Sequence, residues 1–270
     1  MAGIFGLFLL ISAIALSTSH FIAFFSFEGL IIVVGGVIAV AFMSFHENDV
    51  EEALRCIRNM FKENSATHAN LRDDMLDILN WARIVRERGL PGLELSMKQK
   101  GIDDPFVRYG LNMVITDYSP EEIRNMMETA ADAYYERDSV PVQVLQSMAS
   151  HAPAFGMIGT LVGMVTMLCS LSDNVASIGS SLAISFLSTL YGVVTARMLY
   201  MPAAAKLQQK LDYQRFRNQL VTEGLVMLIA GKSPMYIQDR LNSFLHPEVH
   251  DSLNAVIHSK PVQRLKAIKA

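Results

Sequence analysis

The sequence predicts an all-α membrane protein with four transmembrane helices, a large helical cytoplasmic loop between the second and third, and a cytoplasmic C-terminal helix. The distribution of charge carries this prediction, because all 23 Lys and Arg residues fall within residues 46–137 or 197–270. Residues 1–45 and 138–196 contain none, and each tract is long enough for two spans of about 20 residues. In the charged segment between them, no stretch alternates between apolar and polar residues as a strand does.

The composition excludes several other classes of protein. The chain has 270 residues, is 51% hydrophobic and carries a net charge of −3, which suits neither a disordered chain nor a nucleic-acid-binding protein. Its two cysteines, Cys56 and Cys169, are far apart and lie in different kinds of segment. They therefore indicate neither a disulfide framework nor a metal site.

Residues 1–45 are predicted to hold the first two spans, from Gly3 to His20 and from Gly29 to Phe45. The first apolar run lacks the positively charged start and the small-residue cleavage site of a signal peptide, so it should stay in the membrane. A short link around residues 25–28 turns the chain back. Gly35 and Gly36, inside the second span, indicate close packing against a neighbouring helix.

Residues 46–148 form the predicted cytoplasmic region. It holds 12 of the 23 basic residues, which places it and both termini in the cytoplasm. Ser119, Pro120 and Glu122 have the spacing of a helix start, with Ser119 as N-cap and Glu122 completing a capping box. Asp138–Pro141 is expected to form a bend or joint before the membrane. Apolar residues recur at helical spacing in two runs: Val50, Leu54, Ile57 and Phe61, then Met75, Ile78, Leu79 and Ala82.

Residues 149–202 are predicted to hold the third span, from Ala149 to Leu171, and the fourth, from Gly179 to Met201. Small side chains form one stripe of the fourth span, where a neighbouring helix can pack closely or a narrow passage can be wetted. The stripe consists of Ser181, Ser185, Ser188, Gly192 and Ala196. Residues 203–270 are read as an amphipathic extension of the fourth span into the cytoplasm, followed by a tail.

Thr160 and Thr189 are predicted to lie at nearly the same depth in the bilayer, because each is about fifteen residues from the link between the two spans. Each hydroxyl either bonds to its own helix or lines a path for a polar species. No Asp or Glu lies inside a predicted span, since Glu28 and Asp173 fall in the links. If the chain conducts an ion, a partner must supply the carboxylate.

The third and fourth spans resemble the flagellar stator subunits MotA and PomA of the MotA/TolQ/ExbB group. The resemblance rests on residues 151–163 (HAPAFGMIGTLVG), on residues 188–192 (STLYG) and on Met201-Pro202, and it extends over nearly the whole chain. It implies a multi-pass protein of the bacterial inner membrane, assembled as a ring, by family resemblance a pentamer. The ring would surround a single-span MotB or PomB partner whose membrane aspartate carries the ion. It implies no enzymatic activity and no cofactor beyond the transported Na⁺ or H⁺.

Residues 86–94 (RERGLPGLE) resemble the charged patch with which this family contacts the rotor protein FliG. The resemblance assigns rotor contact to Arg86, Glu94 and Arg88, although the second basic residue of the family pattern often directly follows the first, where Glu87 stands here. Taken alone, the segment also reads as a solvated helix end capped by Gly89.

The predicted function is therefore an ion-conducting stator subunit that converts ion flow into torque. Thr160 and Thr189 form the predicted ion path, together with backbone carbonyls loosened by Pro153 and Gly156. Pro153 and Pro202 are assigned hinge or gating roles. We favour sodium, because a dehydrated sodium ion needs several oxygen ligands and proton-driven relatives often have alanine where Thr160 stands. The alternatives are a proton-driven stator and a TolQ- or ExbB-like envelope energiser, which would be expected to have three spans.

Overall fold

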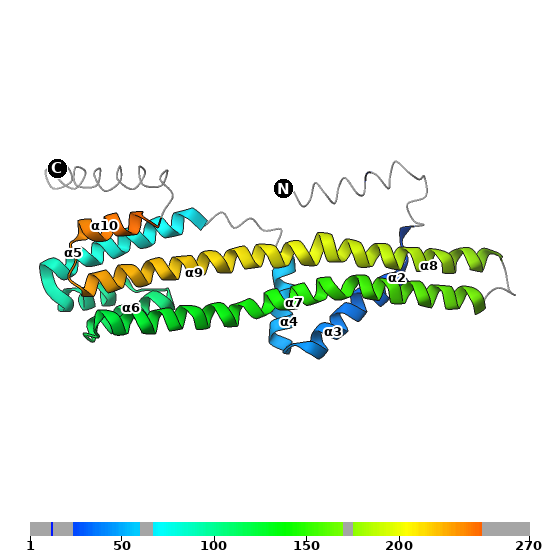
Figure 1. Cartoon of the computed structure of the whole chain (residues 1–270), viewed down its shortest axis with the longest axis horizontal. Coiled ribbons are helices and arrows are strands. Elements are labelled where there is room, and N and C mark those ends of the chain that lie inside the picture. The colour runs from blue at the N-terminus through cyan, green and yellow to red at the C-terminus, as the bar shows by residue number, and fades with distance from the viewer. Residues whose placement is uncertain (1–11, 13–23, 60–66, 170–174, 245–270) are drawn as a thin grey trace. The chain divides into compact units, whose positions relative to one another are not determined.

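The computed structural model describes residue 12 and residues 24–59, 67–169 and 175–244, and within these ranges all regular structure is helical (Figure 1). A short helix α2 leads through a π-helical turn, Ile31–Gly35, into α3. The helices are α2 (Phe27–Leu30), α3 (Gly36–Ser44), α4 (Glu47–Asn59), α5 (Thr67–Lys100), α6 (Pro105–Ile115), α7 (Pro120–Cys169), α8 (Val175–Val194), α9 (Met201–Ile229) and α10 (Pro234–Asn242). The all-α prediction is confirmed for this part of the chain.

The chain forms two compact units. One, here called the apolar unit, comprises residues 1–63 and 138–210. The other, here called the polar unit, comprises residues 64–137 and 211–270. Helices α7 and α9 each contribute to both units.

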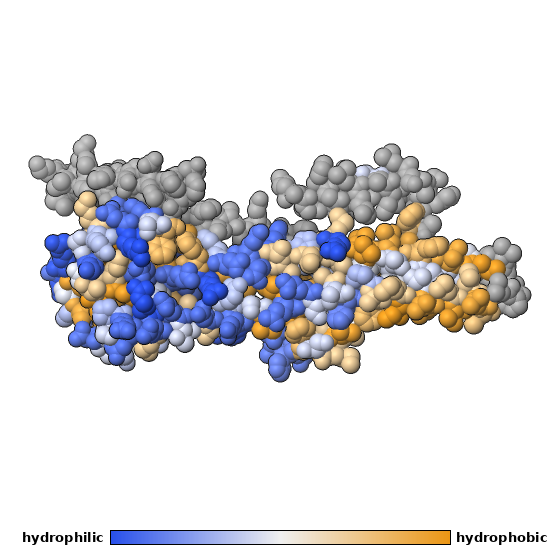
Figure 2. Space-filling view, viewed as in Figure 1, coloured by the Kyte–Doolittle hydropathy of each residue, from blue (hydrophilic) through white to orange (hydrophobic). Residues whose placement is uncertain are grey.

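The apolar unit contains the predicted second, third and fourth spans. Within the described residues, three helical stretches are long and apolar enough to cross a membrane, Phe27–Ser44, Pro120–Cys169 and Ile178–Ile229. Apolar side chains gather along α8 and the C-terminal part of α7 (Figure 2). Apart from Ser12, the predicted first span lies outside the described residues, as does the link between the third and fourth spans.

The prolines of α7 and α9 do not end their helices. Helix α7 continues through Pro141 and Pro153, so the joint predicted at Asp138–Pro141 is not a break in the helix. A proline removes one backbone hydrogen bond, and the turns on either side of it retain theirs. A π-helical turn, Thr195–Tyr200, precedes Pro202, and the Met201 N–H bonds five residues back to Ala196 O.

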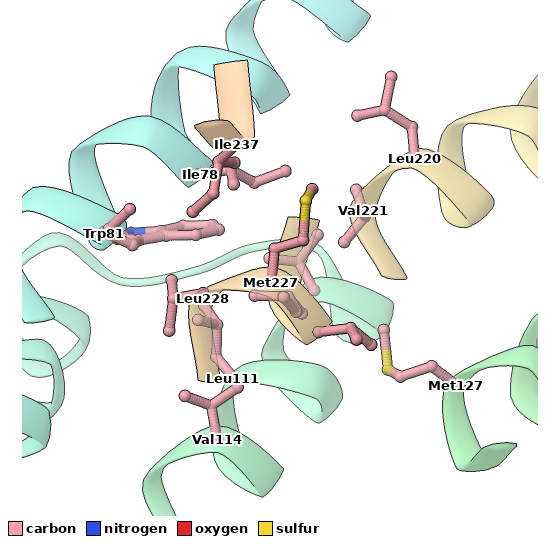
Figure 3. Packing of buried hydrophobic residues seen from close by; sticks show 14 of the residues in the cluster. Ile78, Trp81, Leu111, Val114, Met127, Leu220, Val221, Met227, Leu228 and Ile237 are labelled. Atoms are coloured by element: carbon pink, nitrogen blue, oxygen red, sulfur yellow. The ribbon is translucent and has the colours of Figure 1, made fainter. Parts of the chain in front are cut away.

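The polar unit has its own hydrophobic core. Side chains from α5, α6, α7, α9 and α10 converge in it, with Trp81 of α5 facing Met227 and Leu228 of α9 (Figure 3). Leu111 of α6 and Ile237 of α10 are fully buried there. Burial of each such side chain contributes about 1.5–3 kcal/mol, so this unit has a well-packed interior of its own.

Two local signals of the polar unit act as the sequence predicts. The Ser119 N–H donates to Glu122 Oε2 at 2.9 Å, and the Glu122 N–H donates to Ser119 Oγ at 3.3 Å, which is the predicted capping box at the start of α7. In α5, Gly89 has φ 69° and ψ −173° and interrupts the helix, with Pro91 two residues later. Only glycine adopts this backbone region readily, so Gly89 fixes a kink there.

Candidate functional site

The candidate site lies where α7 and α8 pack backbone to backbone. A Cβ atom on Gly192 would lie 2.6 Å from Ala152 O, and one on Gly156 would lie 3.1 Å from Thr189 Cα. A Cβ atom on Gly163 would lie 2.9 Å from Ser181 O. The absence of side chains at these positions is therefore what allows the two helices to approach so closely.

The predicted small-residue stripe of α8 faces this interface. Ser181, Ser185 and Ser188 are all buried although they are polar, and Gly192 is in contact with Gly156 across the interface. Ser188 also contacts Gly29 of α2, where an added Cβ would lie 2.8 Å from the Ser188 hydroxyl. The stripe is a packing surface, as the sequence predicts.

Thr160 of α7 and Thr189 of α8 meet at this interface. Their hydroxyl oxygens are 2.6 Å apart, a distance typical of an O–H···O hydrogen bond. Thr160 Oγ1 is also within 3.1 Å of Gly156 O, one turn back in its own helix, and within 3.3 Å of Ser185 O across the interface. Thr189 Oγ1 lies 3.4 Å from the same Gly156 carbonyl. Thr160 thus makes the contact with its own helix that the sequence offered as one of two alternatives, and it also contacts Thr189.

The pair can offer oxygen ligands but no charge. Two hydroxyls and the carbonyls of Gly156 and Ser185 lie together, and Thr189 is exposed on the open side of the helix pair. Among the described residues no cluster of His, Cys, Asp and Glu has the geometry of a metal site. This arrangement suits transient contact with a cation whose countercharge comes from elsewhere.

Pro153 and Gly156 occupy the turn of α7 next to this pair. Pro153 has no N–H, so the carbonyl one turn earlier, that of Ala149, lacks its usual helical donor. Gly156 is buried, and its carbonyl faces both threonine hydroxyls. Pro202 lies in a different region, at the start of α9.

Tyr191 holds the start of α2 against α8, a role that the sequence did not indicate. Its hydroxyl donates to Phe24 O at 2.6 Å and accepts from the Ser26 N–H at 2.9 Å. Ser26 in turn caps α2 by accepting from the Gly29 N–H at 3.2 Å. Because Tyr191 is two residues after Thr189, this contact anchors α8 to the chain before α2 at a point close to the threonine pair.

The predicted rotor-contact residues lie on both sides of the Gly89 kink. Arg86 and Arg88 precede it and are exposed, whereas Glu94 follows it and is partly exposed. The Lys98 ammonium donates to Glu94 Oε1 at 2.7 Å, one turn further along α5. The patch thus presents two exposed basic side chains before the kink and an ion pair after it.

The polar unit also contains an ion triad that the sequence did not predict. Arg217 of α9 donates to Asp74 of α5, with Nη2 2.7 Å from Oδ1, and also to Asp104, the N-cap of α6. Burial alone would raise the pKa of Asp104, but the hydrogen bond and charge of Arg217, together with the N–H groups of Phe106 and Val107, lower it below its usual value. The hydrogen bond to Asp74 is the main cause that raises the pKa of Arg217. The triad joins α5, α6 and α9 within this unit.

Comparison with known proteins places this geometry in context. The model of the MotA/TolQ/ExbB proton channel family matches residues 98–220. Motility protein A of Borreliella burgdorferi is 32% identical over 197 residues, covering 73% of this chain and 74% of that protein. The uncharacterized protein YtxD of Bacillus subtilis is 34% identical, covering 84% of this chain and 81% of that protein. The structure of the flagellar MotAB stator complex from Bacillus subtilis matches with a TM-score of 0.80 at 26% identity, covering 93% of this chain and 97% of the matched chain.

Proposed function

This chain belongs to the MotA/TolQ/ExbB proton channel family, and we propose that it is the MotA-type subunit of a flagellar stator. As a channel subunit it is not an enzyme. The observation that carries the proposal is the contact of 2.6 Å between Thr160 and Thr189, held where glycines bring α7 and α8 together. Polar groups at membrane depth are costly unless they are paired or face a polar species, and here the paired hydroxyls include that of Thr189, which is exposed.

The proposed complex contains a single-span partner of the MotB or PomB type. Within the predicted spans this chain has hydroxyls and carbonyls but no Asp or Glu, so the partner's membrane aspartate would supply the countercharge. Several copies of this chain, five by resemblance, would surround the partner in the inner membrane, with both termini in the cytoplasm. Exposed apolar side chains on α7, including Met157, Leu161 and Val165, provide surface for lipid or for neighbouring helices.

We propose sodium as the coupling ion. A sodium ion that sheds its hydration shell needs several oxygen ligands at once, and the two threonine hydroxyls would provide two beside the partner's aspartate, with the Gly156 carbonyl accepting a hydroxyl proton. A proton could cross on water and the carboxylate alone. No cofactor is required for either ion.

We propose that Arg86, Arg88 and Glu94 contact the rotor protein FliG. Exposed charges of opposite sign give orientation and fast association without high affinity, which suits a contact that forms and breaks at each step of rotation. The Gly89 kink presents Arg86 and Glu94 from two differently directed helical segments.

Co-purification tests the stator proposal. The detergent-solubilised chain should bring down a single-span protein that carries one membrane aspartate, and a strain whose own stator is deleted should swim when both are expressed. Motility restored by this chain without any such partner would contradict the proposal. The ion is tested by replacing external sodium with potassium at fixed pH, because a sodium-driven stator should then slow and stop. Undiminished swimming would instead identify a proton-driven stator.

A further inference from the structure

Ser185 of α8 forms a reciprocal contact with Thr160 across the helix interface. Its hydroxyl lies 3.1 Å from Thr160 O and 3.2 Å from Ser181 O of its own helix, so it can donate to either carbonyl. In the other direction, Thr160 Oγ1 lies 3.3 Å from Ser185 O. Each residue thus offers its hydroxyl to the backbone carbonyl of the other.

The structure gives hydroxyl hydrogen bonds for two serines of the stripe, Ser185 and Ser188, and of these two only Ser185 bonds across the interface. Ser188 is equally buried, and its hydroxyl donates at 2.7 Å to Ile184 O of its own helix, as serines in membrane helices usually do. Each of these serines packs against a glycine of α7, since a Cβ atom on Gly163 would lie 2.2 Å from Ser185 Oγ and one on Gly159 would lie 2.5 Å from Ser188 Oγ, but only Ser185 has a carbonyl of α7 within reach. The gap left by Gly163 lets the Ser185 hydroxyl reach α7.

The contact between Ser185 and Thr160 affects where the hydroxyl protons of the threonine pair can go. Thr160 and Thr189 each have one hydroxyl proton, and in the resting pair one of these protons lies between the two oxygens. The oxygen that accepts it keeps one free lone pair, and both oxygens keep two lone pairs for a cation only when each proton goes to another acceptor. Gly156 O is within reach of both hydroxyls and Ser185 O is within reach of Thr160. A carbonyl has two lone pairs, so each can accept a hydroxyl proton beside its helical N–H donor.

We propose that Ser185 is a positioning residue for the coupling ion. Its hydroxyl, bonded to Thr160 O, holds α7 and α8 in the register at which Ser185 O can take the Thr160 proton. The Thr160 oxygen is then free for the ion at no loss of hydrogen bonds. This inference rests on the proposed role of Thr160 and Thr189 as ion ligands.

The test compares Ser185→Ala with Ser188→Ala, which removes the same oxygen from an equally buried serine that bonds only to its own helix in the described structure. Swimming speed is measured against external sodium concentration in a strain with no other stator, and membrane abundance is checked by immunoblotting. Ser185→Ala should raise the sodium concentration for half-maximal speed about three- to tenfold, the effect of one hydrogen bond, while speed at saturating sodium is largely retained. Ser188→Ala should leave the half-maximal concentration unchanged.

A double variant separates positioning from general packing. If Ser185 acts through Thr160, then Thr160→Ala combined with Ser185→Ala should be no worse than Thr160→Ala alone, whereas independent effects would add. Additive losses in the double variant would overturn the inference. So would a sodium dependence of Ser185→Ala that matches that of Ser188→Ala while that of Thr160→Ala is shifted. In both cases the threonine ion site itself would remain supported. No shift in Thr160→Ala would instead refute the threonine site itself, and the role of Ser185 with it.

Discussion

Replacing Gly192 with alanine should separate α7 from α8 and break the threonine pair. The new Cβ would lie 2.6 Å from Ala152 O, where ordinary contact begins at 3.4 Å, so the helices must move apart by roughly 0.8 Å at this level. The contact lies on backbone atoms, which cannot rotate away. Thr189 is one turn from Gly192, and the same shift would stretch its 2.6 Å contact with Thr160 to about 3.4 Å, beyond the usual O–H···O range.

We expect Gly192→Ala to cost about 1–3 kcal/mol of helix packing and to slow swimming sharply even at high sodium. The matched control is Gly179→Ala in the same helix, because a Cβ at Gly179 meets no atom within 4 Å. An alanine there should be neutral or slightly stabilising, since alanine favours helix by up to about 1 kcal/mol over glycine. Swimming speed and thermal stability of the purified complex are the two measurements. Equal behaviour of the two variants would refute the close-packing explanation.

Three further outcomes are expected. Arg86→Glu should abolish rotation and leave ion conductance intact, and a compensating charge reversal on FliG should restore motility. Loss of ion conductance would instead show that the patch is structural. The polar unit should lose stability as the pH falls below about 4. Arg217 lowers the pKa of Asp104 in the fold, so the stability that this pair contributes is complete above the unfolded pKa of 3.8 and is lost as the pH falls through the lower folded pKa. Circular dichroism should show a weaker acid dependence in Asp104→Asn, and an unchanged one would contradict this. Tyr191→Phe should cost about 1 kcal/mol by freeing the chain around Ser26, seen as a lower melting temperature, and an unaltered melting temperature would show that this contact is dispensable.

The features that the sequence predicted depend on local spacing. Counting residues from the link between the spans put Thr160 and Thr189 at one depth, and the structure brings their hydroxyls into contact. The capping box at Ser119 and the interruption at Gly89 likewise depend on a few neighbouring residues. Such signals fix the backbone locally, whatever the rest of the chain does.

The features that were missed depend on which helices meet. Arg217 finds its two aspartates 113 and 143 residues away, a pairing that no sequence spacing specifies. Tyr191 reaches the chain before α2 at a separation of 167 residues, and Ser185 reaches Thr160 only because Gly163 leaves room. The stripe pattern identified Ser185 as a small packing residue, but its direction of hydrogen bonding follows from the helix pair.

The threonine pair as ligand for the coupling ion is tested most directly by comparing Thr160→Ser with Thr160→Ala. Both variants lose the methyl group, and only serine keeps the hydroxyl that contacts Thr189 at 2.6 Å. Swimming speed is recorded across a range of sodium concentrations at constant pH and ionic strength. The ion-ligand role predicts that the serine variant keeps a sodium dependence close to that of the unaltered chain and that the alanine variant needs far more sodium or stops. Identical curves for the two variants would contradict it.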